Sequence, residues 1–561
     1  MTVKKVVIVG GVAGGMSAAT RLRRRSESTE IVVLDRGPYV SFANCGLPYH
    51  LGGEIADRNK LIVQSPERLR AVFNLDVRAN SDVTSIDRAA RQVVVTDRTT
   101  GRVYREDYEH LILSPGAAPV VPPLPGIDRP GHFTLRTIPD MDGILAWVRS
   151  HGARTACVVG GGYIGVEAAE QLQRLGLSVT LVEALPQILR PFDPEMVAPV
   201  HQELRSHGVA LQLGHAVVGF EAATESERAL ASVVTLKNGT RVPADVVILA
   251  LGVRPETTLA AESGLAIGPN RGIRVDEFLR TSDPHVWAVG DAIEVTHGVT
   301  KRPCLLALAG PANRQGRLVA DNILGPPRAY PGTLGTAVVR VFGMTAACTG
   351  ANEEVLAAAG LPLAAVHLHP NQHAGYFPGA KPIALKLLYS PETGAVLGAQ
   401  AVGPDGADKR IDVFATAIRA GMTVDDVADL ELCYAPPYGS AKDPVNLAGM
   451  AAQNARAGLV ESVHWHELAG FAPADSVVLD VREAKEREGG AIPGSVHIPL
   501  GELRHRLAEL PRDKIILAHC ASGQRSYNAC RLLTQHGFRC RNLSGSYKTW
   551  AAGRSSQTTI D

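Results

Sequence analysis

Two glycine-rich loops constrain the fold of this chain more than any other feature. The first follows the apolar run at residues 6–9, the second follows the apolar run at 156–159, and a helix-forming segment comes after each. Such a loop lets the chain turn tightly at the end of a buried strand and brings its backbone close to a phosphate at a helix N-terminus. The sequence therefore predicts two dinucleotide-binding domains, each built on a parallel sheet.

The first loop carries Gly10 and Gly15 at the first and third glycine positions of a dinucleotide fingerprint, with Val12 in place of the second. The strand predicted at 31–34 ends at Asp35, where a carboxylate suits the hydroxyls of a ribose. Asp35 thus favours a bound dinucleotide although the glycine set is incomplete.

The second loop has all three glycines, Gly160, Gly162 and Gly165, and the strand predicted at 178–182 ends at Glu183. A carboxylate there accepts hydrogen bonds from the 2′-hydroxyl of NAD and repels the 2′-phosphate of NADP, so we expect NADH rather than NADPH. A single loop of this kind is often only a tight turn, but two copies, each with its acid, argue against that reading.

Composition excludes several classes of protein. At 561 residues the chain is long enough for about three or four domains, at roughly 100–200 residues each. With 45% hydrophobic residues, 20% charged residues and a net charge of +1, it offers no electrostatic case for binding nucleic acid. The first strand starts too early for a signal peptide, and no apolar run is long enough to cross a bilayer, so we expect a cytoplasmic protein without membrane contact.

The eight cysteines are scattered and form no Cys-x-x-Cys pair, which argues against a disulfide scaffold and against a zinc site; we expect no metal. Cys520 follows the apolar run at 515–518, and the chain there reads as strand, tight loop and helix. Backbone N–H groups and a helix N-terminus converge on such a loop, which lowers the pKa of a thiol and stabilises an anionic sulfur. Cys45 lies shortly after the first nucleotide loop, where a thiolate can meet a flavin.

Two segments resemble one family of flavoproteins. Residues 281–291 resemble the second FAD fingerprint of two-dinucleotide-binding flavoproteins, which implies that Asp291 binds the ribitol of FAD and that the NAD domain is inserted between two FAD-binding parts. Residues 41–45 resemble the single-cysteine motif of the coenzyme A-disulfide reductase branch of the pyridine nucleotide-disulfide oxidoreductases. This resemblance implies that Ser41 and Asn44 contact the cofactor. Larger relatives have a second cysteine where this chain has Val40, so a disulfide beside the flavin is excluded.

The same branch implies a homodimer with tyrosines near the partner subunit's active cysteine. Residues 373–379 and 434–438 match those segments, so Tyr376 and Tyr434 are the candidates. Aromatic packing at a dimer interface is the alternative for both.

The C-terminal part resembles a rhodanese domain in residues 479–483, 492–499 and the Cys520 loop. A phosphatase loop needs an arginine after five intervening residues, but Ser526 stands there and Arg525 closes a shorter loop. The resemblance implies that Arg525 and the loop amides stabilise a sulfur anion on Cys520. Cys530 and Cys540 are expected to be packing residues.

Coenzyme A is the third expected ligand, as a substrate or as a bound carrier of sulfur. The family uses the arginine-rich segment at 21–25 for the 3′-phospho-ADP group, and Arg24 is the clearest equivalent. The alternative is a solvated helix face, since surface arginines are common.

The expected fold class is α/β: two dinucleotide-binding (Rossmann-like) domains, an α+β dimerisation domain and a C-terminal α/β rhodanese domain. The predicted boundaries are 1–150 and 276–325 for FAD binding, 151–275 for NAD(H) binding, 326–450 for dimerisation, 451–462 for a linker and 463–561 for rhodanese.

The resemblance implies a flavoenzyme in which hydride passes from NADH to FAD and then, as electrons, to sulfur on Cys45. The substrate is a persulfide, a polysulfide or coenzyme A disulfide; Cys520 handles sulfane sulfur, and sulfide is released. One alternative is a single-cysteine flavin NADH oxidase or peroxidase. Another is a sulfur carrier or redox sensor with slow turnover.

Overall fold

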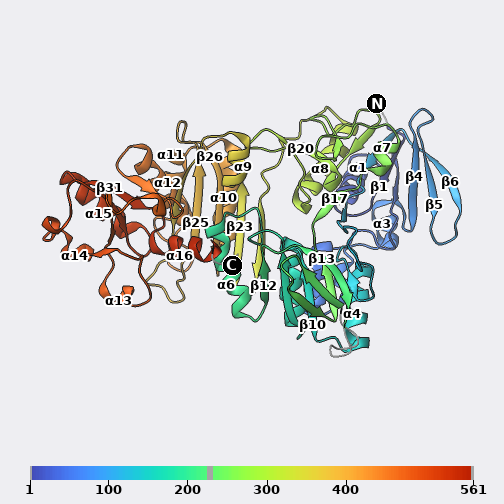
Figure 1. Cartoon of the computed structure of the whole chain (residues 1–561). Coiled ribbons are helices and arrows are strands. Elements are labelled where there is room, and N and C mark those ends of the chain that lie inside the picture. The colour runs from blue at the N-terminus through green and yellow to red at the C-terminus, as the bar shows by residue number, and fades with distance from the viewer. Residues whose placement is uncertain (1–2, 224–231, 558–561) are drawn as a thin grey trace. The chain divides into compact units, whose positions relative to one another are not determined.

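The computed structural model describes residues 3–223 and 232–557 (Figure 1). The chain divides into two compact units. The first comprises Met1–Val182 and Ala216–Gly335, and the second comprises Glu183–His215 and Thr336–Asp561. Each unit is described by itself.

The first unit contains a five-stranded sheet in the order β19-β7-β1-β2-β3, with every neighbouring pair parallel. The central strands are apolar and almost fully buried, as in any parallel sheet covered on both faces. Strand β19 reaches this sheet after an insertion of more than 150 residues, so residues distant in sequence complete it. The strands are β1 (Lys5–Val9), β2 (Glu30–Leu34), β3 (Asp76–Arg78), β7 (His110–Leu113) and β19 (Val286–Ala288).

The inserted segment forms a second parallel sheet. Within this unit its strands lie in the order β11-β10-β16-β9, and an antiparallel sheet β13-β14-β15 accompanies them. The sequence predicts that this domain starts at residue 151, but strand β9 lies before that residue and pairs with β16. Helix α4 then leads from β9 to β10. The elements are β9 (His132–Phe133), α4 (Ile138–His151), β10 (Thr155–Val159), β11 (Ser178–Glu183), β13 (Val217–Ala222), β14 (Ser232–Leu236), β15 (Arg241–Ala244) and β16 (Val246–Leu249).

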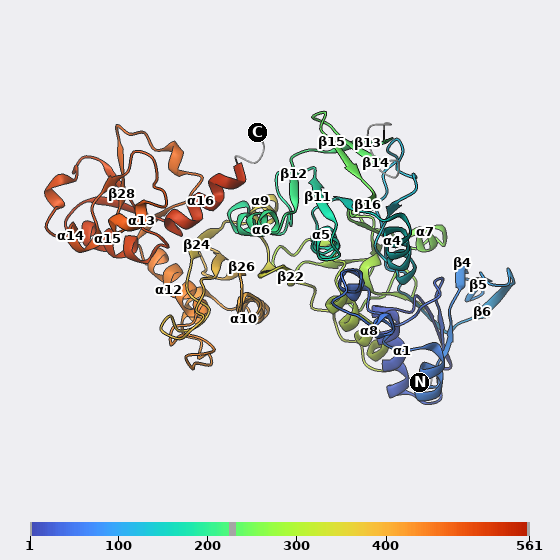
Figure 2. The same cartoon turned by 90° about the horizontal axis from the view of Figure 1, so that it is seen from below.

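Helices α1 (Ala13–Arg25) and α8 (Ala309–Leu324) lie side by side in this unit (Figure 2). Their backbones approach so closely that a Cβ atom on Gly316 would lie 2.1 Å from the carbonyl oxygen of Gly14. Helix α1 begins directly after the first glycine loop, so this crossing fixes the loop against the C-terminal part of the same domain.

The second unit contains a five-stranded antiparallel sheet in the order β22-β23-β26-β25-β24. Helices α10 (Ala407–Ala420) and α12 (Pro444–Arg456) bury apolar side chains such as Ile411, Phe414 and Val445 against it. Helix α6 (Pro194–Ser206) also packs on this sheet. The strands are β22 (Ala337–Val341), β23 (Met344–Gly350), β24 (Ala364–Leu368), β25 (Ala384–Tyr389) and β26 (Val396–Gly403).

The C-terminal domain of this unit has a parallel sheet in the order β27-β31-β30-β28-β29. Helix α12 continues to Arg456 and β27 already begins at Glu461, so the connection is shorter than the linker predicted at 451–462. The alanine-rich sequence prolongs the helix until Gly458 turns the chain at φ +68°. The strands are β27 (Glu461–Val463), β28 (Ser476–Asp480), β29 (Val496–His497), β30 (Ile515–His519) and β31 (Arg539–Leu543).

These sheets confirm the predicted α/β fold class with two parallel-sheet nucleotide domains. Among residues 3–223 and 232–557, no helix combines the length and the apolar character of a bilayer span.

Substitution of two glycines of α8, Gly316 and Gly310, tests the close crossing of α1 and α8. We expect Gly316→Ala to lower the free energy of unfolding by about 1–3 kcal/mol, because the new methyl group overlaps the Gly14 backbone. Gly310→Ala in the same helix is the matched control, since its Cβ would meet only an arginine side chain at 3.6 Å. Denaturant unfolding and the flavin content of the purified protein measure the effect. Equal stability of the two variants would contradict the prediction.

Candidate active sites

A cleft of about 370 Å³ opens above the first parallel sheet. Four predicted cofactor residues line it: Gly10, Asp35, Asn44 and Asp291. The two carboxylate oxygens of Asp35 accept the N–H groups of Gly11 at 2.7 Å and Gly37 at 2.8 Å. Burial raises the pKa of Asp35, and these two N–H groups oppose the rise. The acid is therefore fixed at the end of β2, as a ribose-binding group must be.

Gly10 and Gly15 allow the strand, loop and helix to pack tightly. Gly10 has φ +100°, and a Cβ atom on it would lie 2.0 Å from the carbonyl oxygen of Ser114. A Cβ atom on Gly15 would lie 1.9 Å from the carbonyl oxygen of Gly10. Ser41 is not among the residues lining the cleft; at φ +47° it donates its N–H to the Gly11 carbonyl at 2.8 Å and so holds the adjoining loop.

The second loop repeats this geometry. Gly160 has φ +110°, and its Cβ would lie 2.2 Å from the Ala250 carbonyl oxygen, while that of Gly165 would lie 1.9 Å from the Gly160 carbonyl oxygen. Gly162 precedes helix α5 (Tyr163–Arg174), and the space around its Cβ position is open. The missing side chain leaves the helix N-terminus accessible to a phosphate.

Glu183 is the last residue of β11, as predicted for the ribose-binding acid. One of its carboxylate oxygens accepts the N–H of Leu185 at 2.8 Å.

Asp291 lies in the short helix η3 (Gly290–Ala292), which begins two residues after the end of β19. Burial raises the pKa of its carboxyl group, and Arg136, 3.6 Å away, lowers it. Arg136 also lines the cleft and belongs to the site, although no sequence motif points to it. Its guanidinium donates to the Ala117 carbonyl at 3.0 Å, which keeps it beside Asp291.

Cys45 lies in the short helix η1 (Asn44–Gly46), directly after Asn44, which lines the cleft. Its side chain is exposed, and its Sγ lies 3.6 Å from Asn44 Oδ1. Desolvation nevertheless raises the pKa of this thiol, and the carboxylates of Glu167 and Asp291 raise it further. This setting favours the protonated form of the Cys45 thiol.

Cys520 has the opposite electrostatic setting. It follows β30, precedes helix α15 (Gln524–Gln535) and is 1% exposed. Burial is the largest influence on its pKa and would raise it, but hydrogen bonds from the Ser526 hydroxyl and from loop N–H groups outweigh burial and lower it. The Gly523 N–H lies 3.1 Å from Sγ and the Ser526 Oγ 3.5 Å from it. The loop is therefore built to hold an anionic sulfur.

Arg525 forms a bidentate ion pair with Glu486, with N–O distances of 2.7 and 2.6 Å. This pairing is the main reason that the pKa of Arg525 is raised, and Cys520 contributes less. Sequence reasoning missed Glu486, which comes from α13 (Ala484–Arg487) and partly neutralises the arginine expected to stabilise the anion.

The two predicted tyrosines lie together on the second unit. The hydroxyl groups of Tyr376 and Tyr434 are 2.9 Å apart, and the residues are 75% and 49% exposed. Their hydrogen bond is the main cause of a raised pKa at Tyr376. Residues this exposed are available to a partner subunit.

The arginines of α1 differ in their contacts. Arg21 and Arg25 pair with Asp321 at 2.8 and 2.7 Å, and buried Arg23 donates to backbone carbonyls. Arg24 is exposed, and within the described part of the chain it forms no ion pair with an acidic side chain. Its charge remains available, as a coenzyme A contact requires.

Cys530 is buried and Cys540 half-buried, and their sulfur atoms lie 3.0 Å apart. The contact with Cys540 and burial raise the pKa of Cys530 well above its usual value. Cys530 is therefore a poor nucleophile.

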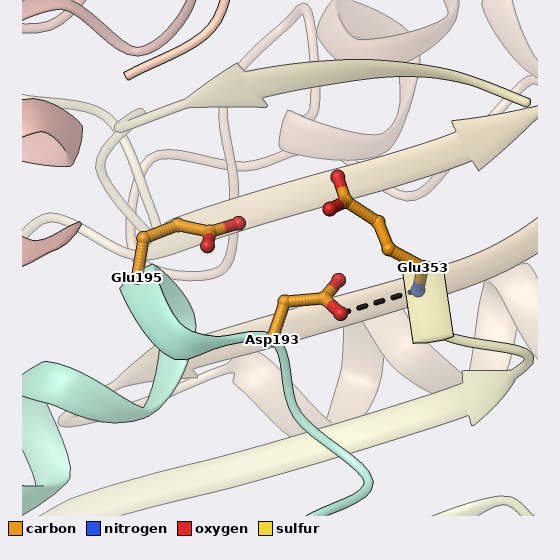
Figure 3. A group of neighbouring side chains, drawn as sticks. All are labelled: Asp193, Glu195 and Glu353. Carbon is orange, nitrogen blue, oxygen red and sulfur yellow. Dashed lines mark hydrogen bonds between the residues drawn. The ribbon is translucent and has the colours of Figure 1, made fainter. Parts of the chain in front are cut away.

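Figure 3 shows three carboxylates, Asp193, Glu195 and Glu353, whose oxygens lie within 4.8 Å of one another. The ammonium group of Lys386 lies 2.8, 2.6 and 2.7 Å from them. A buried side-chain cation thus already contacts all three carboxylates of this cluster.

Comparison with known proteins identifies the family. Residues 4–316 match the pyridine nucleotide-disulphide oxidoreductase family, 336–444 match its dimerisation domain and 466–553 match the rhodanese-like domain. The chain belongs to the pyridine nucleotide-disulphide oxidoreductases and carries a C-terminal rhodanese-like domain. Members of this family use FAD and NAD(H).

Two curated relatives are similar to the reductase part. A coenzyme A disulfide reductase of Staphylococcus haemolyticus is 32% identical over 452 residues, which cover 80% of this chain and 100% of the relative. An NADH oxidase of Methanocaldococcus jannaschii is 32% identical over 445 residues, which cover 79% of this chain and 97% of the relative.

Two solved structures are similar to nearly the whole chain. The reduced CoADR-RHD protein of Bacillus anthracis is 47% identical with a TM-score of 0.96 and covers 99% of both chains. An NAD-dependent persulfide reductase from A. fulgidus is 38% identical with a TM-score of 0.91 and covers 97% of this chain and 100% of the other.

The ion pair beside Cys520 is testable. We expect Glu486→Gln to shift the midpoint of Cys520 alkylation to lower pH, because an uncompensated Arg525 favours the thiolate. At a pH below the midpoint, alkylation should accelerate by about threefold. Glu488→Gln, at an exposed glutamate two residues away, is the control. A shift to higher pH would instead show that Glu486 serves to hold Arg525 in place.

Proposed function

We propose that the protein is an FAD-dependent NADH oxidoreductase that reduces persulfides, polysulfides and coenzyme A disulfide, with a rhodanese domain that handles sulfane sulfur at Cys520. One observation carries the proposal: the chain presents two unpaired cysteines in opposite settings. Cys45 is exposed beside a dinucleotide cleft and disfavours its own thiolate, whereas Cys520 is buried in a loop that favours one. A sulfur reductase coupled to a sulfur-binding domain uses both.

The cleft fits FAD because Asp35, Asn44, Arg136 and Asp291 line it and Gly10 lets the backbone turn close to a phosphate. NADH would be held at the second loop, by Gly162 and the N-terminus of α5 and by Glu183. When bound, FAD takes a hydride from NADH and supplies two electrons to sulfur.

Cys45 is the attacking thiolate of the reductase site. It attacks the sulfur of a disulfide R–S–S–R, a Cys45–S–S–R bond forms, and R–S⁻ leaves; two electrons then restore the thiolate and release the second thiol. With a persulfide R–S–SH, attack at the outer sulfur gives Cys45–S–SH and R–S⁻, and its two-electron reduction releases sulfide. Val40 provides no second thiol, so the electrons for this cleavage come from outside the polypeptide.

Tyr376 and Tyr434 act on the departing sulfur in this proposal. Their paired, exposed hydroxyls suit proton donation to a leaving thiolate across the interface of a homodimer, which the dimerisation domain supports. Arg24 binds a phosphate group of coenzyme A through its available charge. A cytoplasmic location fits eight cysteines that are all free thiols.

Anaerobic turnover tests the reaction. We expect NADH oxidation with coenzyme A persulfide, polysulfide or coenzyme A disulfide, and stoichiometric sulfide with the first two. Cys45→Ser should lower the rate at least about 1,000-fold, because the nucleophile is lost. Cys433→Ser, at another exposed free cysteine, is the matched control and should keep the wild-type rate. Cys520→Ser should keep reduction of coenzyme A disulfide but lose sulfur transfer to the rhodanese loop.

Consumption of NADH only with oxygen or peroxide would replace this proposal by an NADH oxidase or peroxidase. The relative named NADH oxidase keeps that second candidate open. Negligible turnover with every acceptor would instead favour a sulfur carrier or redox sensor.

The choice of nicotinamide nucleotide is a separate prediction. Glu183→Gln should raise kcat/KM for NADPH by about tenfold, because the repulsion between the carboxylate and the 2′-phosphate is removed. The value for NADH should fall, since a hydrogen-bond acceptor for the 2′-hydroxyl is weakened. Glu262→Gln, at an exposed glutamate of α7 (Thr258–Glu262), is the control. An unchanged ratio of the two values would exclude Glu183 from nucleotide recognition.

A further inference from the structure

Ser546 has a backbone conformation that serine rarely adopts. It is the first residue of helix α16 (Ser546–Gln557), its φ is +56°, and it is 0% exposed. The left-handed region is unfavourable for a non-glycine residue, and such strain persists only where the surroundings enforce it. Glycine would adopt this turn without strain, so the serine side chain calls for an explanation.

The Ser546 hydroxyl points into the Cys520 loop. Its Oγ accepts the backbone N–H of Cys520 at 3.1 Å and lies 3.0 Å from the Ser526 Oγ. It also lies 3.7 Å from the Cys520 Sγ, and the Ser526 Oγ lies 3.5 Å from the same sulfur. Two buried hydroxyl groups therefore face one sulfur atom.

Each of these hydroxyls has an alternative acceptor. The Ser546 Oγ lies 3.3 Å from the Leu543 carbonyl oxygen, and the Ser526 Oγ lies 3.0 Å from the Gly523 carbonyl oxygen. A hydroxyl carries one hydrogen, which rotates to the better acceptor. A negative sulfur attracts both hydrogens, whereas a neutral sulfur leaves them to the two carbonyls.

We propose that Ser546 and Ser526 form a pair of rotatable hydroxyl groups, called the hydroxyl pair. Both hydroxyls donate hydrogen bonds to the Cys520 thiolate before sulfur transfer, and both turn to backbone carbonyls afterwards. The inference rests on the proposed function of the Cys520 loop. The Cys520 thiolate attacks the outer sulfur of R–S–SH, the Cys520–S–SH bond forms, and R–S⁻ leaves with the electron pair. The negative charge thereby leaves Sγ, and both hydroxyl hydrogens return to their carbonyls without any net proton transfer.

The segment that carries Ser546 is fixed to the dimerisation sheet within the second unit. The Ser544 Oγ accepts the N–H of His367 on β24 at 3.1 Å, and Thr549 Oγ1 lies 2.8 Å from His369 Nε2. On the side of the loop, the N–H groups of Tyr547 and Lys548 each donate at 3.1 Å, to the carbonyls of Cys520 and Ala521. Contacts on both sides of Ser546 therefore enforce the strained turn.

His367 connects this segment to the buried cluster of Asp193, Glu195, Glu353 and Lys386. Its Nε2 lies 3.0 Å from Glu195 Oε1, which the ammonium group of Lys386 also contacts at 2.6 Å. Trp465 of the rhodanese domain donates its indole N–H to the other oxygen of Glu195 at 3.1 Å. The cluster of Figure 3 thus anchors the rhodanese domain beside the segment that bears Ser546.

The experiment compares Ser546→Gly with the wild-type full-length protein. Glycine removes the strain and the hydroxyl together, so we expect equal or higher thermal stability. The rate of Cys520 alkylation by iodoacetamide, followed on the Cys520 peptide by mass spectrometry across pH, should show a midpoint at higher pH. Alkylation at neutral pH should be about three- to tenfold slower. Sulfur transfer to Cys520 from coenzyme A persulfide should slow by a similar factor.

Two further variants complete the test. Ser476→Ala removes a serine hydroxyl that donates to the Ala472 carbonyl at 2.9 Å in the same domain, and it should keep the wild-type pH profile. Ser546→Ala removes the hydroxyl but keeps the strain, so it should show the same shift as glycine with lower stability. If Ser546→Gly does not fold, Ser526→Ala gives the same readout from the other hydroxyl.

A wild-type alkylation profile in the Ser546 variants would overturn the inference and leave Ser546 as a packing residue. The alkylation experiment needs no sulfur substrate, so this result is independent of the proposed reaction. A shifted profile with no sulfur transfer in any form of the protein would overturn the proposed function and leave the hydroxyl pair as a stabiliser of the thiolate.

Discussion

The contact between a strand end and the helix that follows it organises both nucleotide domains. A Cβ atom would lie 1.9 Å from a carbonyl oxygen at Gly15 and again at Gly165, so each helix touches its own loop backbone at a spacing that only glycine allows. Because the helices cannot shift away from these loops, their N-termini face the space where phosphates bind. Asp35 at the end of β2 is held to the first loop, because its carboxylate accepts the Gly11 N–H at 2.7 Å.

The two sulfur sites depend on opposite uses of charge. Around Cys45 the nearest ionised groups include the carboxylates Glu167 and Asp291, which disfavour a second negative charge. Around Cys520 the main stabilising groups are dipoles, from the loop N–H groups and the Ser526 hydroxyl, while the charge of Arg525 contributes and is shared with Glu486.

Local patterns in the sequence predict the features that a short segment determines. The glycine loops, Asp35, Glu183 and the Cys520 loop each lie within one strand–loop–helix unit, so spacing alone places them. Arg136, Glu486 and Ser546 reach their sites from distant segments and have no motif, so only the folded chain reveals them. Strand β9 joins the second sheet through pairing with β16, a long-range contact that the sequence around β9 does not indicate. Helix α12 continues to Arg456, although the composition of its last residues resembles a linker.

The short connection between Arg456 and Glu461 sets a limit on how sulfur can move. Four residues span at most about 14 Å, and the rhodanese domain is also pinned through Trp465 and Ser544. A domain held this way is not a swinging arm. The Cys520 loop therefore keeps its position beside β24 within the second unit, and any sulfur donor has to reach it there.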